Sequence, residues 1–179
     1  SGGAPQTATS RWAFGAVGLS LPGDDVAAAL ALAHEVQHAK LCALMDLLPL
    51  VTDRGQRLYY APWRPDPRPL ASLLHGLYAH LGVTRFWRRQ REVAADPAEA
   101  HQANVEFARW RSACARVATV VAGRPELTAP GVVFVEAATR PLRRWRREPV
   151  PRAAREEARR AAAEHRGHWE GFFRMTNES

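Results

Sequence analysis

The chain has 179 residues, of which 46% are hydrophobic, and a formal net charge of +7. This size and composition are typical of one globular domain with a buried core. No apolar run approaches the roughly 20 residues that a membrane-spanning helix requires, so we expect no membrane partner. We expect the domain to cover residues 12–179, after a linker or cloning remnant over residues 1–11.

The positive charge comes almost entirely from arginine, since Lys40 is the single lysine. The arginines concentrate in residues 85–91 and 140–160. A bias of this kind is typical of a GC-rich genome, so nucleic acid is not the favoured partner, and a basic surface also attracts acidic peptides. The two cysteines, Cys42 and Cys114, argue against a disulfide framework and favour a reducing, cytoplasmic location.

The first half of the chain alternates apolar stretches with strong breaks. Residues 12–21 form an apolar stretch, either a strand or a packed lead-in, that ends at Pro-Gly. A helix then runs from a cap at residues 24–25 to about Leu48, where Pro49 stops it. Its apolar residues occupy most faces, so we expect it to be central and buried. After a turn over residues 52–57, residues 58–69 contain four prolines and therefore predict a rigid, non-helical loop.

The second half reads as further helices. Helices are predicted from residue 70 to about 92, from 98 to about 122, and from 152 to about 169. Between the last two, residues 126–145 predict a turn and a further helix, in which residues 132–135 are ambiguous and resemble a strand. The expected fold is mostly α, with little or no sheet.

The motif HEVQH, residues 34–38, lies inside the first helix. Residues four apart on a helix differ by about 40° around its axis, so His34 and His38 can bind one metal ion from one face. Glu35 lies about 100° away, beside the open positions of that ion. This is a zincin-like arrangement, and we favour a metal site over two structural histidines, because adjacent imidazoles on an apolar helix need partners.

The residues that follow the motif do not extend it as known zinc proteases do. One extension of the motif requires glycine and histidine where Leu41 and Leu44 stand. Another takes a glutamate from the next helix, but no glutamate occurs between Glu35 and Glu92. A third ligand must come from elsewhere.

His75 is the preferred third ligand. It shares a helix face with small residues, which would let its helix approach the motif closely. His80 is five residues away, about 140° around the helix, so we expect it on another face and exposed. The candidates considered are His75, His80, Asp46, Asp53 and Asp66.

Two metals and two reactions remain open at this point. With zinc and Glu35 as general base, the reaction would be peptide hydrolysis. With Fe(II), the site could activate oxygen with a carboxylate-bearing cosubstrate, which requires a cation. Arg64 and Arg68, in the proline-rich loop, could provide a bidentate grip, or could simply tie the loop to the core.

Several stretches together resemble a known family. These are HEVQHAKLCALMDLLPL, YYAPWRPDPRPLASLLHGLYAHLGVTRFWR, EFARWR and LTAPGVVFV. They resemble the HExxH peptide-modification domain of bacterial ribosomal peptide pathways, which includes 2-oxoglutarate-dependent peptide β-hydroxylases and extensions of FxSxx-type radical SAM/SPASM maturases. The resemblance covers roughly residues 12–169.

The resemblance implies a mononuclear Fe(II) site that hydroxylates Cβ of a residue in a precursor peptide. His34 and His38 match the motif histidines of the family, and His75 matches its downstream histidine. Glu35 would then handle a proton rather than act as a protease base. By chemistry, we expect Arg68 or Arg64 to hold 2-oxoglutarate.

Two aromatic residues near the arginine loop, Tyr60 and Trp63, are candidates for binding the peptide, with packing as their alternative role. Cys42 follows His38 by four residues and could add a thiolate, but a buried structural thiol is favoured. Two other functions remain as alternatives: a zinc metallopeptidase that acts on a precursor or leader peptide, and a non-catalytic domain that recruits the precursor peptide to a radical SAM maturase, fused or separate.

Overall fold

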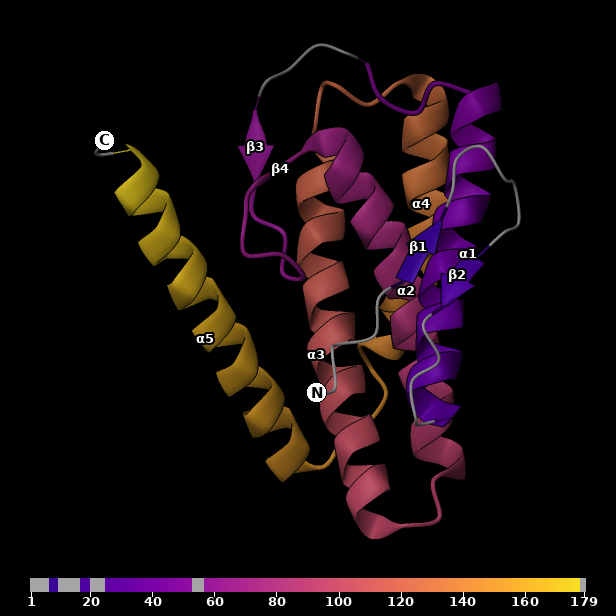
Figure 1. The fold of residues 1–179 in the computed structure, drawn as a ribbon, viewed down its shortest axis with the longest axis vertical. Helices are drawn as coiled ribbons and strands as arrows, with labels where there is room; N and C mark the ends of the chain where they lie inside the picture. Colours follow the sequence, from indigo (N-terminus) through magenta and orange to yellow (C-terminus); the bar gives the residue numbers. More distant parts are fainter. Residues whose placement is uncertain (1–6, 10–16, 20–24, 53–56, 178–179) are drawn as a thin grey trace.

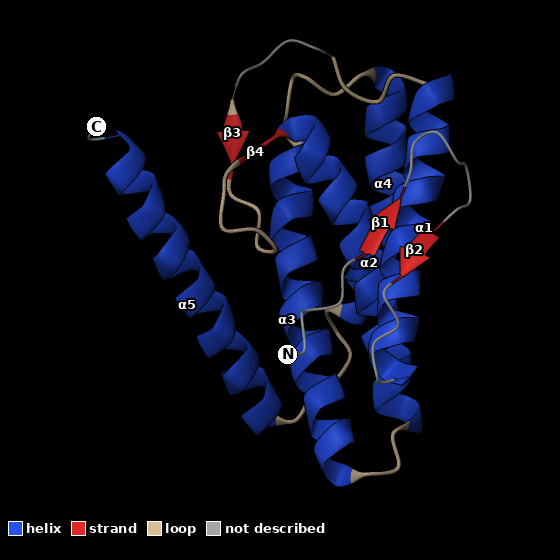
Figure 2. Ribbon diagram, in the orientation of Figure 1, coloured by secondary structure: helices blue, strands red, loops and turns tan. Residues whose placement is uncertain are grey.

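The computed structural model describes residues 7–9, 17–19, 25–52 and 57–177, with side chains over 25–52 and 57–171. This part of the chain is mostly helical, as the sequence predicts, and its strands are short (Figure 2). The helices are α1 (Asp25–Leu47), α2 (Leu70–Val93), α3 (Pro97–Ala122), α4 (Ala129–Trp145) and α5 (Arg152–Asn177). The strands are β1 (Thr7–Thr9), β2 (Val17–Leu19), β3 (Leu58–Tyr59) and β4 (Arg68–Pro69).

The ends of the helices follow from capping residues. The Asp96 side chain accepts hydrogen bonds from the backbone N–H of Ala98 and Glu99, at 2.8 and 3.0 Å, and Pro97 opens α3. Thr128 caps α4 in the same way through Gly131 N–H, at 3.0 Å. The predicted bounds of α1, α2 and α3 are therefore confirmed within two residues, and the ambiguous residues 132–135 are helical. The last helix extends further than predicted, to Asn177.

The central helix is α2, which packs against α1 on one side and along α3 on the other (Figure 1). The expectation that the HEVQH helix is central is wrong. Among the described residues of α1, only Glu35 and Leu41 are buried, and Leu47 is 80% exposed. The apolar residues of α1 are instead divided between two neighbours, because the paired strands β1 and β2 contact this helix as well as α2.

The core lies between α2 and α3. Leu73, Leu74 and Leu77 of α2 are at most 1% exposed, as is Phe107 of α3. α4 and α5 each pack on α3, and α5 diverges from it toward the C-terminus (Figure 1). This framework fixes α2, on which half of the candidate site is built.

The loop before α2 is closed by a short antiparallel pair of strands. Leu58 pairs with Pro69, and Tyr59 with Arg68. The Tyr59 hydroxyl donates to Glu126 Oε1 at 3.2 Å, which ties the loop to the segment before α4. Residues 58–69 are thus non-helical and ordered, as their prolines predict.

Some expected features fall outside the described residues. These are the turn at 53–56, most of the apolar stretch over 12–21, and most of the proposed linker over 1–11, of which residues 7–9 form β1. The boundary between linker and domain stays a prediction. Among the residues that the structure describes, no helix is both long and apolar enough to span a bilayer.

Candidate active site

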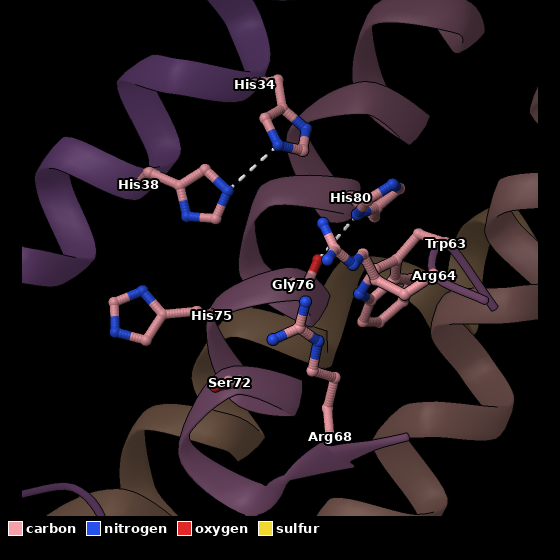
Figure 3. Close-up of a pocket in the computed structure, with 9 residues that line it drawn as sticks. All are labelled: His34, His38, Trp63, Arg64, Arg68, Ser72, His75, Gly76 and His80. Atoms are coloured by element: carbon pink, nitrogen blue, oxygen red, sulfur yellow. Dashed lines mark hydrogen bonds between the residues drawn. The ribbon is translucent and has the colours of Figure 1, made fainter. Parts of the chain in front are cut away.

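A cavity of about 480 Å³ opens between α1, α2 and the proline-rich loop (Figure 3). Four of the seven histidines in the sequence line it, and two arginines face them from the loop side. The lining residues are His34, His38, Trp63, Arg64, Arg68, Ser72, His75, Gly76 and His80. Both motif histidines, the preferred third ligand and both predicted cosubstrate arginines thus meet in one place.

The two motif histidines are placed as a pair of metal ligands. Their Nε2 atoms are 3.0 Å apart and form a hydrogen bond with each other. Two nitrogens that each lie ~2.1 Å from one ion, at a right angle, are also separated by about 3.0 Å. Burial lowers the pKa of His34, and the neighbouring His38 lowers it further against the opposing charge of Glu35. The pKa of His38 is also lowered, mainly by burial. Both rings are therefore neutral at pH 7, the form that binds a metal.

His75 lines the same cavity but stands further away. Its ring is stacked below that of His38, with ring centroids 6.0 Å apart and planes inclined by 22° (Figure 3). Its pKa is lowered by burial and then by His38. Among the described residues, no three His, Cys, Asp or Glu side chains lie close enough to hold one ion together. The His34–His38 pair is preformed, and a third ligand requires a side-chain rotation.

His80 is not exposed, which corrects the expectation from helical spacing. It is 8% exposed and lies between Trp63 and Trp110, with ring centroids 4.5 and 4.7 Å away. Its Nδ1 donates to the Gly76 carbonyl at 2.8 Å, so Nε2 carries no proton in the neutral ring. Burial lowers its pKa to about 3, against the effect of that hydrogen bond. The ring centroid of His80 lies 5.2 Å from that of His34, which makes it a second candidate for the third ligand.

The spacing argument failed for His80 because α2 is enclosed on several sides. An argument from a helical wheel assumes one buried face, but α2 packs against α1, α3 and the loop. His75 therefore faces the cavity, while His80 on another side of α2 is buried as well. The proline-rich stretch before α2 could have indicated this, since a rigid loop that returns along a helix covers another of its faces.

The two arginines are held by one carboxylate. Asp66 contacts Arg64 Nε through Oδ1 and Arg68 Nη2 through Oδ2, each at 3.1 Å. Asp66 itself does not line the cavity. The side chain of Arg68 is 30% exposed and that of Arg64 is 51% exposed, so Arg68 is the better shielded of the two. Neutral imidazoles and two guanidinium groups together make a cavity that favours an anionic ligand.

Three residues with predicted roles lie elsewhere. Glu35 is 5% exposed on α1 and does not line the cavity. Tyr60 also lies outside it and instead forms a 2.8 Å hydrogen bond between its hydroxyl and Nδ1 of His165 on α5. Cys42 does not line it either, and is a free thiol of intermediate exposure. Trp63, by contrast, lies in the wall of the cavity.

Helix α2 approaches α1 closely beside the histidine pair. A Cβ atom on Gly82 would stand 2.6 Å from Gln37 Cγ and 3.1 Å from the carbonyl oxygen of Ala33. Glycine is therefore the residue that permits this separation of the helices, as the small residues on the His75 face predict. Ala33 and Gln37 precede His34 and His38 by one residue each, so the contact sets the position of both.

The chain was compared with protein-family models, with curated proteins and with solved structures. None of the three comparisons finds a significant match.

Proposed function

We propose that this domain is an Fe(II)- and 2-oxoglutarate-dependent hydroxylase that acts on Cβ of a residue in a ribosomally made precursor peptide. The observation that carries the proposal is the pairing of His34 and His38, with Nε2 atoms 3.0 Å apart, in one cavity with Arg64 and Arg68. A metal at the pair would have a guanidinium group within the same cavity to hold the far carboxylate of the cosubstrate. The resemblance to HExxH peptide-modification domains supports the same assignment.

In this proposal His34 and His38 bind the metal, and His75 completes the set by rotation toward them. Bound iron and 2-oxoglutarate would supply oxidation of the cosubstrate to succinate and CO₂, with one oxygen atom of O₂ inserted into a C–H bond of the peptide. Trp63 lines the cavity on the loop side, where its ring covers one face of His80.

A zinc peptidase is the less favoured reading. A general base must lie within hydrogen-bond reach of the water it activates, or one water away. Glu35 is buried and outside the cavity lining, and the lining contains no Asp or Glu side chain among the described residues. The neutral and cationic lining fits binding of a 2-oxo diacid better than activation of water by a carboxylate.

The test is anaerobic reconstitution with Fe(II), followed by titration with 2-oxoglutarate. A visible metal-to-ligand charge-transfer band is expected, lost in His38→Ala and in His75→Ala. His101→Ala is the matched control, because His101 is 43% exposed and pairs with Glu157 instead. With a suitable peptide, the reaction should give one succinate for each product of +16 Da.

Either of two results would overturn the proposal. One is stoichiometric zinc binding with peptide cleavage that is independent of oxygen and lost in Glu35→Gln, which would establish a peptidase. The other is the absence of any band, with precursor-peptide binding that survives removal of metal, which would establish a recruiting domain. His80→Ala distinguishes the two candidates for the third ligand, since the band should survive it if His75 is the ligand.

A further inference from the structure

A second cavity, of about 420 Å³, lies between α3 and α5 and is lined by cationic side chains. Four arginines, two from each helix, surround a floor of alanine methyl groups. We call it the arginine groove; its lining is Arg109, Ser112, Arg116, Ala158, Arg159, Ala162, Ala163 and Arg166. The metal and cosubstrate cavity shares none of these residues.

The charge of the arginine groove is poorly neutralised by the protein itself. Arg109 has Glu106 at 3.8 Å and Arg166 has Glu170 at 3.8 Å, both long for an ion pair. Arg116 and Arg159 form no ion pair with any carboxylate of the described residues, and both are exposed. The lining contains no Asp or Glu in the described part of the chain. Four like charges around one hollow favour an anionic ligand.

Three of these four arginines act on one half-buried phenol, that of Tyr60. The pKa of Tyr60 is raised by burial, and the charges of Arg166, Arg116 and Arg109 oppose that rise. The fields of both walls of the groove therefore converge near Tyr60. The guanidinium carbon of Arg166 lies 4.7 Å from the centre of the Tyr60 ring.

Two connections link the arginine groove with the candidate active site, one through ring contacts and one along the polypeptide. The guanidinium of Arg109 lies 4.6 Å from the centre of the Trp110 ring, which in turn lies 4.7 Å from the ring of His80. On the other side, Tyr60 belongs to the loop that carries Trp63, Arg64 and Arg68. A ligand bound to Arg109 in the groove would thus be linked to the metal and cosubstrate cavity through the rings of Trp110 and His80.

We propose that the arginine groove binds an acidic segment of the peptide substrate, and so holds that peptide next to the site that modifies it. This inference rests on the proposed function, because it assumes that the substrate is a peptide. The fork of a guanidinium matches a carboxylate bidentately, and the alanine floor provides apolar contact for the peptide between its acidic side chains.

A peptide fits the groove better than a single-stranded nucleic acid. Such nucleic acids need free aromatic faces on which their bases stack. Among the described residues, no aromatic side chain lines the groove, and the ring of Tyr60 beside it is covered by the guanidinium of Arg166. The groove provides charge without a stacking platform.

Arg116 and Arg159 are the residues to change, because they have no carboxylate partner and cover no aromatic ring in the described part of the chain. The test uses the full chain and a fluorescein-labelled peptide of ten glutamates, with binding followed by fluorescence anisotropy at 50 mM salt. We expect Arg116→Gln/Arg159→Gln to bind this peptide about tenfold more weakly than the wild type.

The control variant is Arg143→Gln/Arg147→Gln, which removes the same charge from another arginine-lined cavity, at the end of α4, that contains Glu148. It should bind the peptide within about twofold of the wild type. Equal weakening in both double variants would show general charge attraction and overturn the proposal. So would tighter binding of a ten-nucleotide oligothymidylate that is lost in Arg116→Gln/Arg159→Gln.

The iron and 2-oxoglutarate band separates this proposal from the proposed function. The band should form normally in Arg116→Gln/Arg159→Gln, because neither arginine lines the metal and cosubstrate cavity. A band in the wild type without binding of the glutamate peptide would overturn the groove alone. Site-specific peptide binding without a band would support the groove and overturn the hydroxylase.

Discussion

A Cβ atom on Gly76 would stand 2.3 Å from the indole Nε1 of Trp63, so this ring lies directly on the bare backbone of α2. The same indole stacks on His80, with planes inclined by only 14°. Trp63 is followed at once by Arg64, so the position of the ring also fixes the start of the arginine-bearing part of the loop. The lack of a side chain at Gly76 is therefore a requirement of the candidate site.

The first prediction is that Gly76→Ala displaces Trp63. The added methyl group has no space, and overpacking of this kind costs about 1–3 kcal/mol. We expect a corresponding loss in the free energy of unfolding, measured by urea denaturation, with weaker 2-oxoglutarate binding because the loop moves. Gly167→Ala is the control: nothing lies within 4 Å of its Cβ position, so the helix should gain about 0.5–1 kcal/mol. Equal effects at both glycines would contradict the role of Gly76.

The second prediction separates the two arginines of the cavity. Arg68→Lys keeps the charge but loses the bidentate fork, and should weaken 2-oxoglutarate binding about tenfold. Arg64→Lys should weaken it by only about twofold, because the Arg64 side chain is 51% exposed and more strongly screened. Calorimetric titration of the Fe(II)-loaded protein measures both. A larger loss of 2-oxoglutarate affinity in Arg64→Lys than in Arg68→Lys would show that Arg64 is the main ligand of the cosubstrate.

A third prediction concerns Glu148, which lies just after α4 and ties this segment to α2. Glu148 is 14% exposed and accepts from Arg88 Nε at 2.8 Å and from Arg91. Glu148→Gln leaves Arg91 with no carboxylate partner among the described residues and Arg88 with only Glu92, at 3.6 Å, and should lower the free energy of unfolding by about 1–3 kcal/mol. Glu92→Gln removes another partner of Arg88 at a side chain that is 40% exposed, and should change stability by at most about 0.5 kcal/mol. Urea denaturation measures both free energies of unfolding, and equal losses in the two variants would contradict the special role of Glu148.

The fourth prediction is a loss of stability at alkaline pH that depends on one thiol. Complete burial raises the pKa of Cys114 to about 12, against a weak contact with the Thr84 hydroxyl. Above pH ~8.5 an unfolded thiol releases its proton, whereas the folded thiol keeps it. The unfolded state then binds fewer protons, so stability falls with rising pH, by up to ~1.4 kcal/mol per pH unit.

The measurement is urea denaturation at pH 8.5, 9.5 and 10.5 in the presence of a reductant. Cys114→Ala should be less stable at pH 8.5, because it leaves a small cavity, but should lack this part of the slope. Cys42→Ala, at a thiol of intermediate exposure, should keep the wild-type slope. Parallel slopes for the wild type and Cys114→Ala would refute the assignment.

The sequence predicts the helices well because their ends depend on local chemistry. Pro49 ends α1, Asp96 and Pro97 open α3, and the prolines of residues 58–69 exclude a helix there. The grouping of His34, His38 and His75 in one cavity was predictable in part, since helical spacing places the motif pair on one face and the small residues around His75 favour close packing of its helix.

The sequence does not predict which helix is central. The apolar faces of α1 look like those of a buried helix, but small alanine side chains cover little surface, and α1 lies at the edge of the bundle. Placing α2 in the centre changes the environment of His80 from solvent to two tryptophans. The partnership of Tyr60 with His165 joins residues 105 apart in sequence, and no local pattern predicts it.

The close approach of α2 to α1 at Gly82 sets the distance between the two halves of the candidate site. His34 and His38 lie on α1, and the two candidate third ligands, His75 and His80, lie on α2. The distance between the helices therefore determines how far the candidate ligands lie from one another. The helices could not lie this close with a larger residue at Gly82, because a methyl group there would press on Ala33 and Gln37. Under the proposed function, the size of the ion that these histidines could bind would therefore depend on Gly82, a residue two turns from His75 that is not itself a ligand.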